Sequence, residues 1–110
     1  MGQSVRDFSA TQLHTYLSTA NTAPRLLDVR EPWEYDIAHL KGSELVPLKS
    51  IPGKLERFDP EQEMVVICHH GIRSMQVCRY LASLGFTHLI NLRGGVNAWA
   101  RDIDRLMSTY

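Results

Sequence analysis

Several features that would point directly to one functional class are scarce or absent in this chain. The 110 residues include only two cysteines, too few for the disulfide framework of a small secreted domain. Basic and acidic residues balance at twelve each, whereas nucleic-acid-binding modules carry a strong basic excess. The apolar runs fall far short of the roughly 20 residues that a membrane-spanning helix needs. We therefore expect neither nucleic acid nor a membrane among the partners.

The amino-terminal stretch MGQSVRDFSATQLH has no apolar segment of the kind found in signal peptides. We therefore expect both cysteines to be reduced, because disulfides persist mainly in oxidising compartments. The chain length suits one domain, and a chain of this size buries about 65% of its unfolded surface on folding. The sequence thus predicts a single cytoplasmic domain over residues 1–110.

Short apolar runs alternate with segments of helical periodicity along the chain. Ser9 suits the N-cap of a helix, and Leu13 and Leu17 follow it with a spacing of four. The sequence predicts strands at 26–29, 45–46, 64–67 and 88–92, helices at 9–19, 33–38, 74–84 and 96–107, and a helical turn at 49–57. Such alternation indicates an α/β fold with a mainly parallel sheet and helices on both faces.

The stretch CHHGIRS, residues 68–74, joins a predicted strand to a predicted helix. Ligands of such sheets bind outside the carboxyl ends of the strands, which is where Cys68 falls. A cysteine thiolate is a nucleophile, and helix N-termini and basic neighbours favour it. Gly71 lets the loop curl its N–H groups around an anion, and Ser74 can cap the next helix. Arg73 offers a fork of donors suited to sulfonate, sulfate or phosphate. These parts together can hold an anionic sulfur beside an oxyanion.

Three stretches of the chain share features with a single set of motifs. CHHGIRS has the pattern Cys-x-x-Gly-x-Arg-Ser, and LLDVREPWEYDIAHLKGS places Asp-Val-Arg before a Glu-aromatic pair and a His-hydrophobic-x-Gly turn. NLRGGVNAW has the pattern Gly-Gly-x-x-x-Trp. Together the three span residues 26–99 and resemble, in the same order, the signatures of the rhodanese-like family, single-domain type.

The resemblance implies an enzyme, a thiosulfate sulfurtransferase of the rhodanese type, built on a doubly wound central parallel sheet. By the family's pattern, Cys68 takes sulfur from thiosulfate or a related small anion and carries it as a persulfide. A thiol, cyanide or protein acceptor then removes the sulfur. Ping-pong kinetics are expected for such a covalent intermediate. The resemblance also implies that no metal and no organic cofactor is needed.

The candidate site is carried over residue by residue from these motifs. Cys68 is the expected catalytic residue, and the expected substrate-binding residues are His69, His70, Gly71, Ile72, Arg73 and Ser74. Asp28 and Arg30 are expected in support, paired with each other or with groups near the site. The roles of the two histidines stay open, since a protonated imidazole can stabilise a thiolate but either side chain can also point into solvent.

The sequence also bears on residues outside this site and on alternative functions. Cys78, Trp33 and Trp99 are expected to be core or packing residues. One alternative function is a rhodanese-like binding or regulatory module with little turnover. Another is a phosphatase or arsenate reductase, but phosphatases of similar fold have five residues between Cys and Arg, and here four lie between Cys68 and Arg73. The shorter loop favours sulfur transfer.

Overall fold

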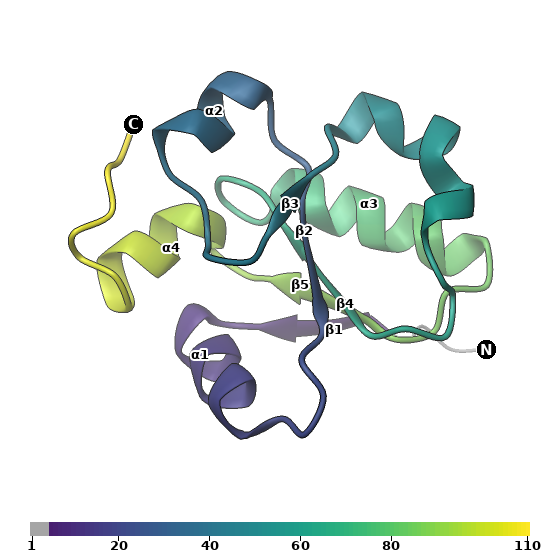
Figure 1. Ribbon diagram of the computed structural model, residues 1–110, viewed down its shortest axis with the longest axis horizontal. Helices are drawn as coiled ribbons and strands as arrows, with labels where there is room; N and C mark the ends of the chain where they lie inside the picture. Colours follow the sequence, from purple (N-terminus) through teal and green to yellow (C-terminus); the bar gives the residue numbers. More distant parts are fainter. Residues whose placement is uncertain (1–4) are drawn as a thin grey trace.

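Five parallel strands form the centre of the molecule (Figure 1). The computed structural model describes residues 5–110. The strands are β1 (Val5–Phe8), β2 (Arg25–Asp28), β3 (Glu44–Leu45), β4 (Met64–Ile67) and β5 (Leu89–Leu92). Their order across the sheet is β1-β5-β4-β2-β3. The predicted α/β fold, a central parallel sheet flanked by helices, is therefore confirmed.

The helices lie between or after these strands. They are α1 (Ala10–Thr19), α2 (Pro32–Ile37), the 3₁₀ helix η1 (Leu48–Arg57), α3 (Ile72–Ser83) and α4 (Gly95–Asp102). Ser9 caps α1 as predicted: its Oγ accepts a hydrogen bond from the Gln12 N–H at 3.1 Å, and its own N–H donates to the Gln12 side chain at 2.8 Å. Within residues 5–110, no helix is long and apolar enough to cross a membrane.

The two faces of the sheet have separate apolar cores. Met64 and Val66 of β4 belong to the core under η1 and α3, whereas Val65 and Ile67 belong to the core under α1 and α4. Because side chains alternate along a strand, the continuous apolar run of β4 serves both faces. Figure 1 shows α1 and α3 on opposite sides of the sheet. All four β4 side chains are buried, so the strand is a rigid support for the loop that follows it.

The edge strand β1 was missing from the sequence prediction. It is four residues long, and its two central residues, Arg6 and Asp7, are charged and exposed. An edge strand tolerates such residues, but they remove the apolar run by which a buried strand is recognised. In the structure β1 pairs with β5, and Asp7 is the register partner of Asn91.

The predicted helix over 96–107 was too long, because α4 ends at Asp102. The N–H groups of Ile103 and Asp104 both donate to the Trp99 carbonyl oxygen at 2.9 Å, which closes the last turn. Ile103, Leu106 and Met107 keep a helical spacing in the sequence beyond that point. However, the Leu106 side chain is 97% exposed. The segment after Asp102 instead runs back toward α2 (Figure 1).

Candidate active site

The loop after β4 surrounds the sulfur of Cys68 with donors. Cys68 is 1% exposed and directly follows the carboxyl end of the central strand β4. The Gly71 N–H donates to its Sγ at 3.0 Å, and the Ser74 N–H donates to the same atom at 3.3 Å. Two backbone dipoles therefore converge on one sulfur atom. This arrangement can stabilise negative charge on sulfur without any charged side chain in contact.

Gly71 takes a backbone conformation that other residues rarely adopt. Its φ is +97°, and it is the N-cap of α3. A Cβ at this position would lie 3.0 Å from the Gly94 nitrogen and 3.1 Å from the Leu92 carbonyl oxygen. The helix therefore starts at Ile72, and the prediction that Ser74 caps it is wrong. Ser74 lies in the first turn, where its hydroxyl accepts a hydrogen bond from the Cys68 thiol at 3.3 Å.

The side chains of the remaining loop residues face different surroundings. His69 is partly buried, and its buried Nδ1 has no hydrogen-bond partner among the described residues. Burial, and then the neighbouring His70, lower the pKa of His69, so its imidazole is neutral at neutral pH. His70 is exposed, and Ile72 is 72% exposed. A stabilising positive charge is thus not supplied by His69 at neutral pH.

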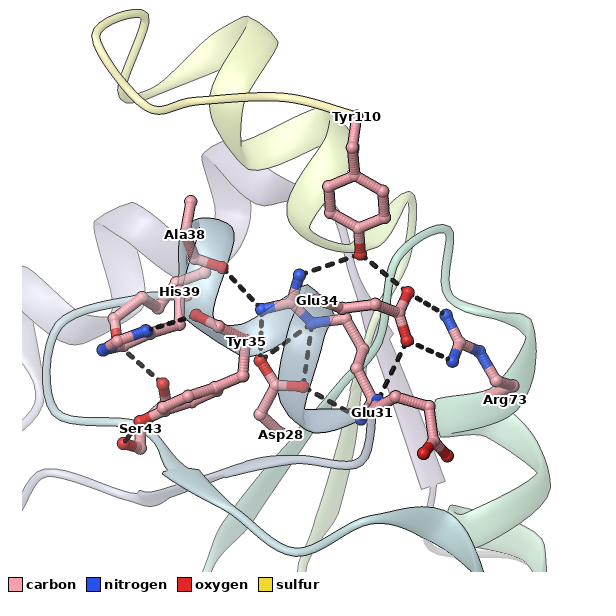
Figure 2. Close-up of polar contacts among 11 residues, drawn as sticks. Asp28, Glu31, Glu34, Tyr35, Ala38, His39, Ser43, Arg73 and Tyr110 are labelled. Carbon is pink, nitrogen blue, oxygen red and sulfur yellow. Dashed lines mark hydrogen bonds and ion pairs between the residues drawn. The ribbon is translucent and has the colours of Figure 1, made fainter.

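Arg73 forms an ion pair that the sequence did not predict. Its two terminal nitrogens donate to the two carboxylate oxygens of Glu34 in α2, at 2.8 and 2.9 Å (Figure 2). The Glu34 side chain is 6% exposed. The Arg73 guanidinium holds the pKa of that carboxyl at about 2, and Glu34 in turn raises the pKa of Arg73. The fork of donors that was expected to bind an anion from solution is therefore occupied by a carboxylate of the same chain.

We expect Glu34→Gln to lower the free energy of unfolding at neutral pH by roughly 1–3 kcal/mol, because an amide cannot balance the charge of Arg73. The pKa of Glu34 is depressed in the folded state, so its contribution is complete above the unfolded value and is lost as the pH falls towards about 2. Urea denaturation of both proteins over this range is the measurement, and the two stability curves should converge in acid.

The matched control for this variant is Glu61→Gln. The Glu61 side chain is 82% exposed, so this change should alter the free energy of unfolding by less than about 0.5 kcal/mol. The opposite outcome is a wild type that exceeds Glu34→Gln by the same free energy of unfolding in strong acid as at neutral pH. That result would contradict the assignment of the stabilisation to the Glu34 carboxylate.

Asp28 and Arg30 pair with each other under the loop. Both side chains are fully buried, with Arg30 Nε 2.9 Å from Asp28 Oδ1 and Nη2 2.8 Å from Oδ2. Arg30 also donates to the Ala38 carbonyl oxygen at 2.7 Å and to the Tyr110 hydroxyl at 2.9 Å. Of the two alternatives for this pair, the structure shows mutual pairing. A guanidinium with 0% exposure is not placed to attract a donor anion from solvent.

Tyr110 links the two ion pairs beside the loop. Its hydroxyl accepts from Arg30 at 2.9 Å and donates to Glu34 Oε2 at 2.8 Å. Figure 2 shows the contact between Tyr110 and Glu34. Its ring lies 4.3 Å from the His69 ring and 5.4 Å from the Trp33 ring, centroid to centroid. Trp33 is 59% exposed, so of the two expectations for it, a core or a packing residue, the structure shows packing against Tyr110. Through these contacts Tyr110 lies beside the loop that carries Cys68.

The second cysteine lies away from solvent in the core. Cys78 of α3 is 0% exposed and packs with the apolar side chains between α3 and the sheet, as expected. Burial raises the pKa of Cys78 to about 12, so it is a thiol at neutral pH. In the part of the chain that the structure describes, no three His, Cys, Asp or Glu side chains are placed to hold a metal ion.

Comparison with known proteins identifies the family. The family model for the "Rhodanese-like domain" matches residues 9–102. The chain belongs to the rhodanese-like domain family. A crystal structure of a rhodanese-like domain protein from Staphylococcus aureus superposes with a TM-score of 0.79 at 26% identity, covering 86% of this chain and 90% of that one. The fold and the three motifs therefore agree with the match.

Relatives of this rhodanese-like domain include named sulfurtransferases. A sulfurtransferase of Allochromatium vinosum is 36% identical over 69% of this chain and 71% of that protein. The rhodanese-like/PpiC domain-containing protein 12 of Arabidopsis thaliana chloroplasts is 35% identical over 96% of this chain. The chain spans 38% of the length of the Arabidopsis protein. The family thus includes proteins that are named sulfurtransferases.

Asn91 is a further residue of this rhodanese-like site that the sequence analysis missed. It lies in β5, is 3% exposed and accepts a hydrogen bond from the Ser74 hydroxyl. The signal was available, because Asn91 is the one polar residue in the buried strand sequence LINL. Glu34 also had a signal, as part of the Glu-aromatic pair in the first motif. Nothing near Tyr110 in the sequence indicates its contacts.

Proposed function

We propose that this protein transfers sulfane sulfur, carrying it as a persulfide on Cys68. The donor is thiosulfate or a related small anion, and the acceptor is a thiol or cyanide. One observation carries the proposal: the Cys68 sulfur lies at the carboxyl end of β4 with two backbone N–H groups directed at it, at 3.0 and 3.3 Å. The family membership and the sulfurtransferase names of relatives support the same reaction class.

The first half-reaction loads the sulfur. The Cys68 thiolate attacks the outer sulfur of thiosulfate, a new S–S bond forms, and the old S–S bond breaks with its electron pair leaving on sulfite. The negative charge then resides on the outer sulfur of the persulfide. The N–H groups of Gly71 and Ser74 are directed at the Cys68 sulfur to which the outer sulfur is bonded, and they can stabilise negative charge on the sulfur pair.

The second half-reaction unloads the sulfur. Cyanide or an acceptor thiolate attacks the outer sulfur, and Cys68 leaves as a thiolate. With cyanide the product is thiocyanate, and with a thiol the product is a new persulfide. The same N–H groups then receive the restored charge on the Cys68 sulfur, so the loop serves both half-reactions. Neither step needs a redox cofactor.

The structure bears on the alternative functions through the loop. Phosphate hydrolysis on a loop of this kind needs an arginine fork facing the phosphoryl oxygens. Here both terminal nitrogens of Arg73 are bound to Glu34. Together with the four residues between Cys68 and Arg73, this favours sulfur over phosphate as the transferred group. A binding module without turnover has no need of a cysteine sulfur with two converging donors.

Intact-protein and peptide mass spectrometry after thiosulfate treatment test the proposal. We expect the peptide containing Cys68 to gain one sulfur atom, and cyanide to remove it with release of thiocyanate. A reducing agent should also remove the added sulfur, whereas a sulfinic acid would resist it. If thiosulfate and other sulfane donors leave the folded protein unmodified, the protein is a binding module and the proposal fails.

A further inference from the structure

A buried chain of hydrogen bonds runs from the Cys68 sulfur to the edge of the sheet. The Cys68 thiol donates to Ser74 Oγ at 3.3 Å, and the Ser74 hydroxyl donates to Asn91 Oδ1. Asn91 Nδ2 donates to Asp7 Oδ1 at 3.0 Å. Ser74 is 0% exposed and Asn91 3% exposed, so water cannot easily replace a partner in the middle of this chain. The proposed reaction uses none of the groups beyond Ser74.

The surroundings of Asn91 determine which way its amide points. Nδ2 faces two groups that only accept hydrogen bonds, the Asp7 carboxylate at 3.0 Å and the Gly71 carbonyl oxygen at 3.3 Å. Rotating the amide by half a turn would place Oδ1 against both acceptors. Oδ1 must therefore face Ser74, where the donor that the structure gives it within residues 5–110 is the Ser74 hydroxyl. The pairing of β1 with β5 creates this arrangement, because Asp7 and Asn91 are register partners.

The direction of these hydrogen bonds determines which part of the Ser74 hydroxyl faces the Cys68 sulfur. A hydroxyl has one hydrogen, and that of Ser74 is used by Asn91. Ser74 Oγ therefore presents a lone pair to Cys68, which suits a thiol that donates a hydrogen bond. If Ser74 turned its hydrogen towards a thiolate, Asn91 Oδ1 would be left buried without a donor, which is costly.

We propose that Asn91, oriented by Asp7, is a positioning residue that holds Ser74 as a hydrogen-bond acceptor for Cys68. It thereby restrains Cys68, because the sulfur is denied the hydroxyl hydrogen that would stabilise its nucleophilic thiolate. The backbone N–H groups of Gly71 and Ser74 stay directed at the sulfur for the charge that develops during transfer. The inference rests on the proposed function in one respect, that Cys68 is the sulfur carrier whose unwanted reactions such a restraint limits.

The test is the alkylation rate of Cys68 in Asn91→Leu. Leucine has nearly the shape of asparagine but no acceptor, so the Ser74 hydroxyl becomes free to donate to a thiolate. In a mildly acidic buffer we expect iodoacetamide to label Cys68 about threefold to tenfold faster than in wild type. This range combines a larger thiolate population with the lower nucleophilicity of a hydrogen-bonded thiolate. Peptide mass spectrometry separates Cys68 from the buried Cys78.

Asn91→Leu leaves the charged and titratable groups near the loop in place. These are the Arg73–Glu34 pair, the imidazoles of His69 and His70, the Asp7 carboxylate, which lies 3.6 Å from the Arg93 guanidinium, and Arg79, which lines the same hollow as Asp7 and Asn91. A change in labelling rate therefore reports the hydrogen bonds rather than a change of charge. An unchanged or slower rate in a folded Asn91→Leu protein would overturn the proposal.

A double-mutant cycle shows whether Asn91 acts through Ser74. In a Ser74→Ala background, Asn91→Leu should leave the labelling rate unchanged within about twofold, because no hydroxyl remains to be released. If Asn91 were merely structural, its replacement would loosen the loop to the same extent in both backgrounds. Equal acceleration with and without the Ser74 hydroxyl therefore contradicts the proposal.

Asp7→Asn is a second variant for the case that Asn91→Leu does not fold. Asp7 is exposed on the edge strand and accepts a hydrogen bond from Asn91 Nδ2. An asparagine at position 7 can donate as well as accept, so it no longer holds the Asn91 amide in one orientation. We expect a smaller acceleration of labelling that persists in high salt, where the effect of a lost surface charge is screened. Acceleration that disappears in salt contradicts the orientation argument. Alkylation needs no sulfur donor, so these results hold even if thiosulfate forms no persulfide.

Discussion

We expect Cys68→Ser to abolish the proposed sulfur transfer while the fold remains. A serine hydroxyl cannot form a persulfide, and no other residue can replace the sulfur, because Cys78 is fully buried and burial raises its pKa to about 12. We expect thiosulfate:cyanide activity to fall by at least about 10³-fold, as when other covalent nucleophiles are removed. The serine oxygen can still accept from the Gly71 and Ser74 N–H groups, so the loop keeps its internal bonds.

The measurement is thiocyanate formation by both proteins, with circular dichroism and a thermal transition to show that the variant is folded. Cys78→Ala is the matched control, since it removes the other thiol. It should keep most of the activity and lose about 1 kcal/mol of stability from the missing core sulfur. Substantial turnover by folded Cys68→Ser would refute the persulfide mechanism. Loss of turnover in folded Cys78→Ala would instead show that the second cysteine takes part.

Gly95→Ala should be the most destabilising small substitution near the site. Gly95 begins α4 with a φ of +58°, and an added Cβ would overlap the carbonyl oxygens of Cys68 and His69. Those two oxygens accept the N–H groups of Val96 and Asn97 at 2.9 and 3.0 Å, so the clash would separate α4 from the loop. Overpacking and left-handed strain together predict a loss of about 3 kcal/mol or more.

Urea denaturation of wild type and variant measures this loss directly. The matched control is Gly53→Ala in η1, where an added Cβ has nothing within 4 Å and φ is not positive. That change should alter the free energy of unfolding by less than about 1 kcal/mol, in either direction. If Gly95→Ala is as stable as Gly53→Ala, the close approach of α4 to the loop is not rigid, and the loop geometry described above does not persist in solution.

The sequence by itself determined the fold class and the chemistry of the loop. Both follow from local patterns: apolar runs of strand length, helical spacing behind Ser9, and a cysteine, a glycine and an arginine within six residues. The buried strand β4 was predicted with its observed bounds, 64–67, because all four of its side chains are apolar. Local patterns were weaker where the chain is exposed, which is why β1 was missed and α4 was predicted too long.

Only the tertiary structure decided which groups the site residues contact. Arg73 pairs with Glu34 across 39 positions, Arg30 donates to Tyr110 across 80, and Asn91 donates to Asp7 across 84. A sequence pattern reports which residues share one face of an element, but it does not report how separate elements meet. Strand order, the register of β1 against β5 and the return of the chain after α4 bring these partners together, and they change an expected anion-binding arginine into part of an internal ion pair.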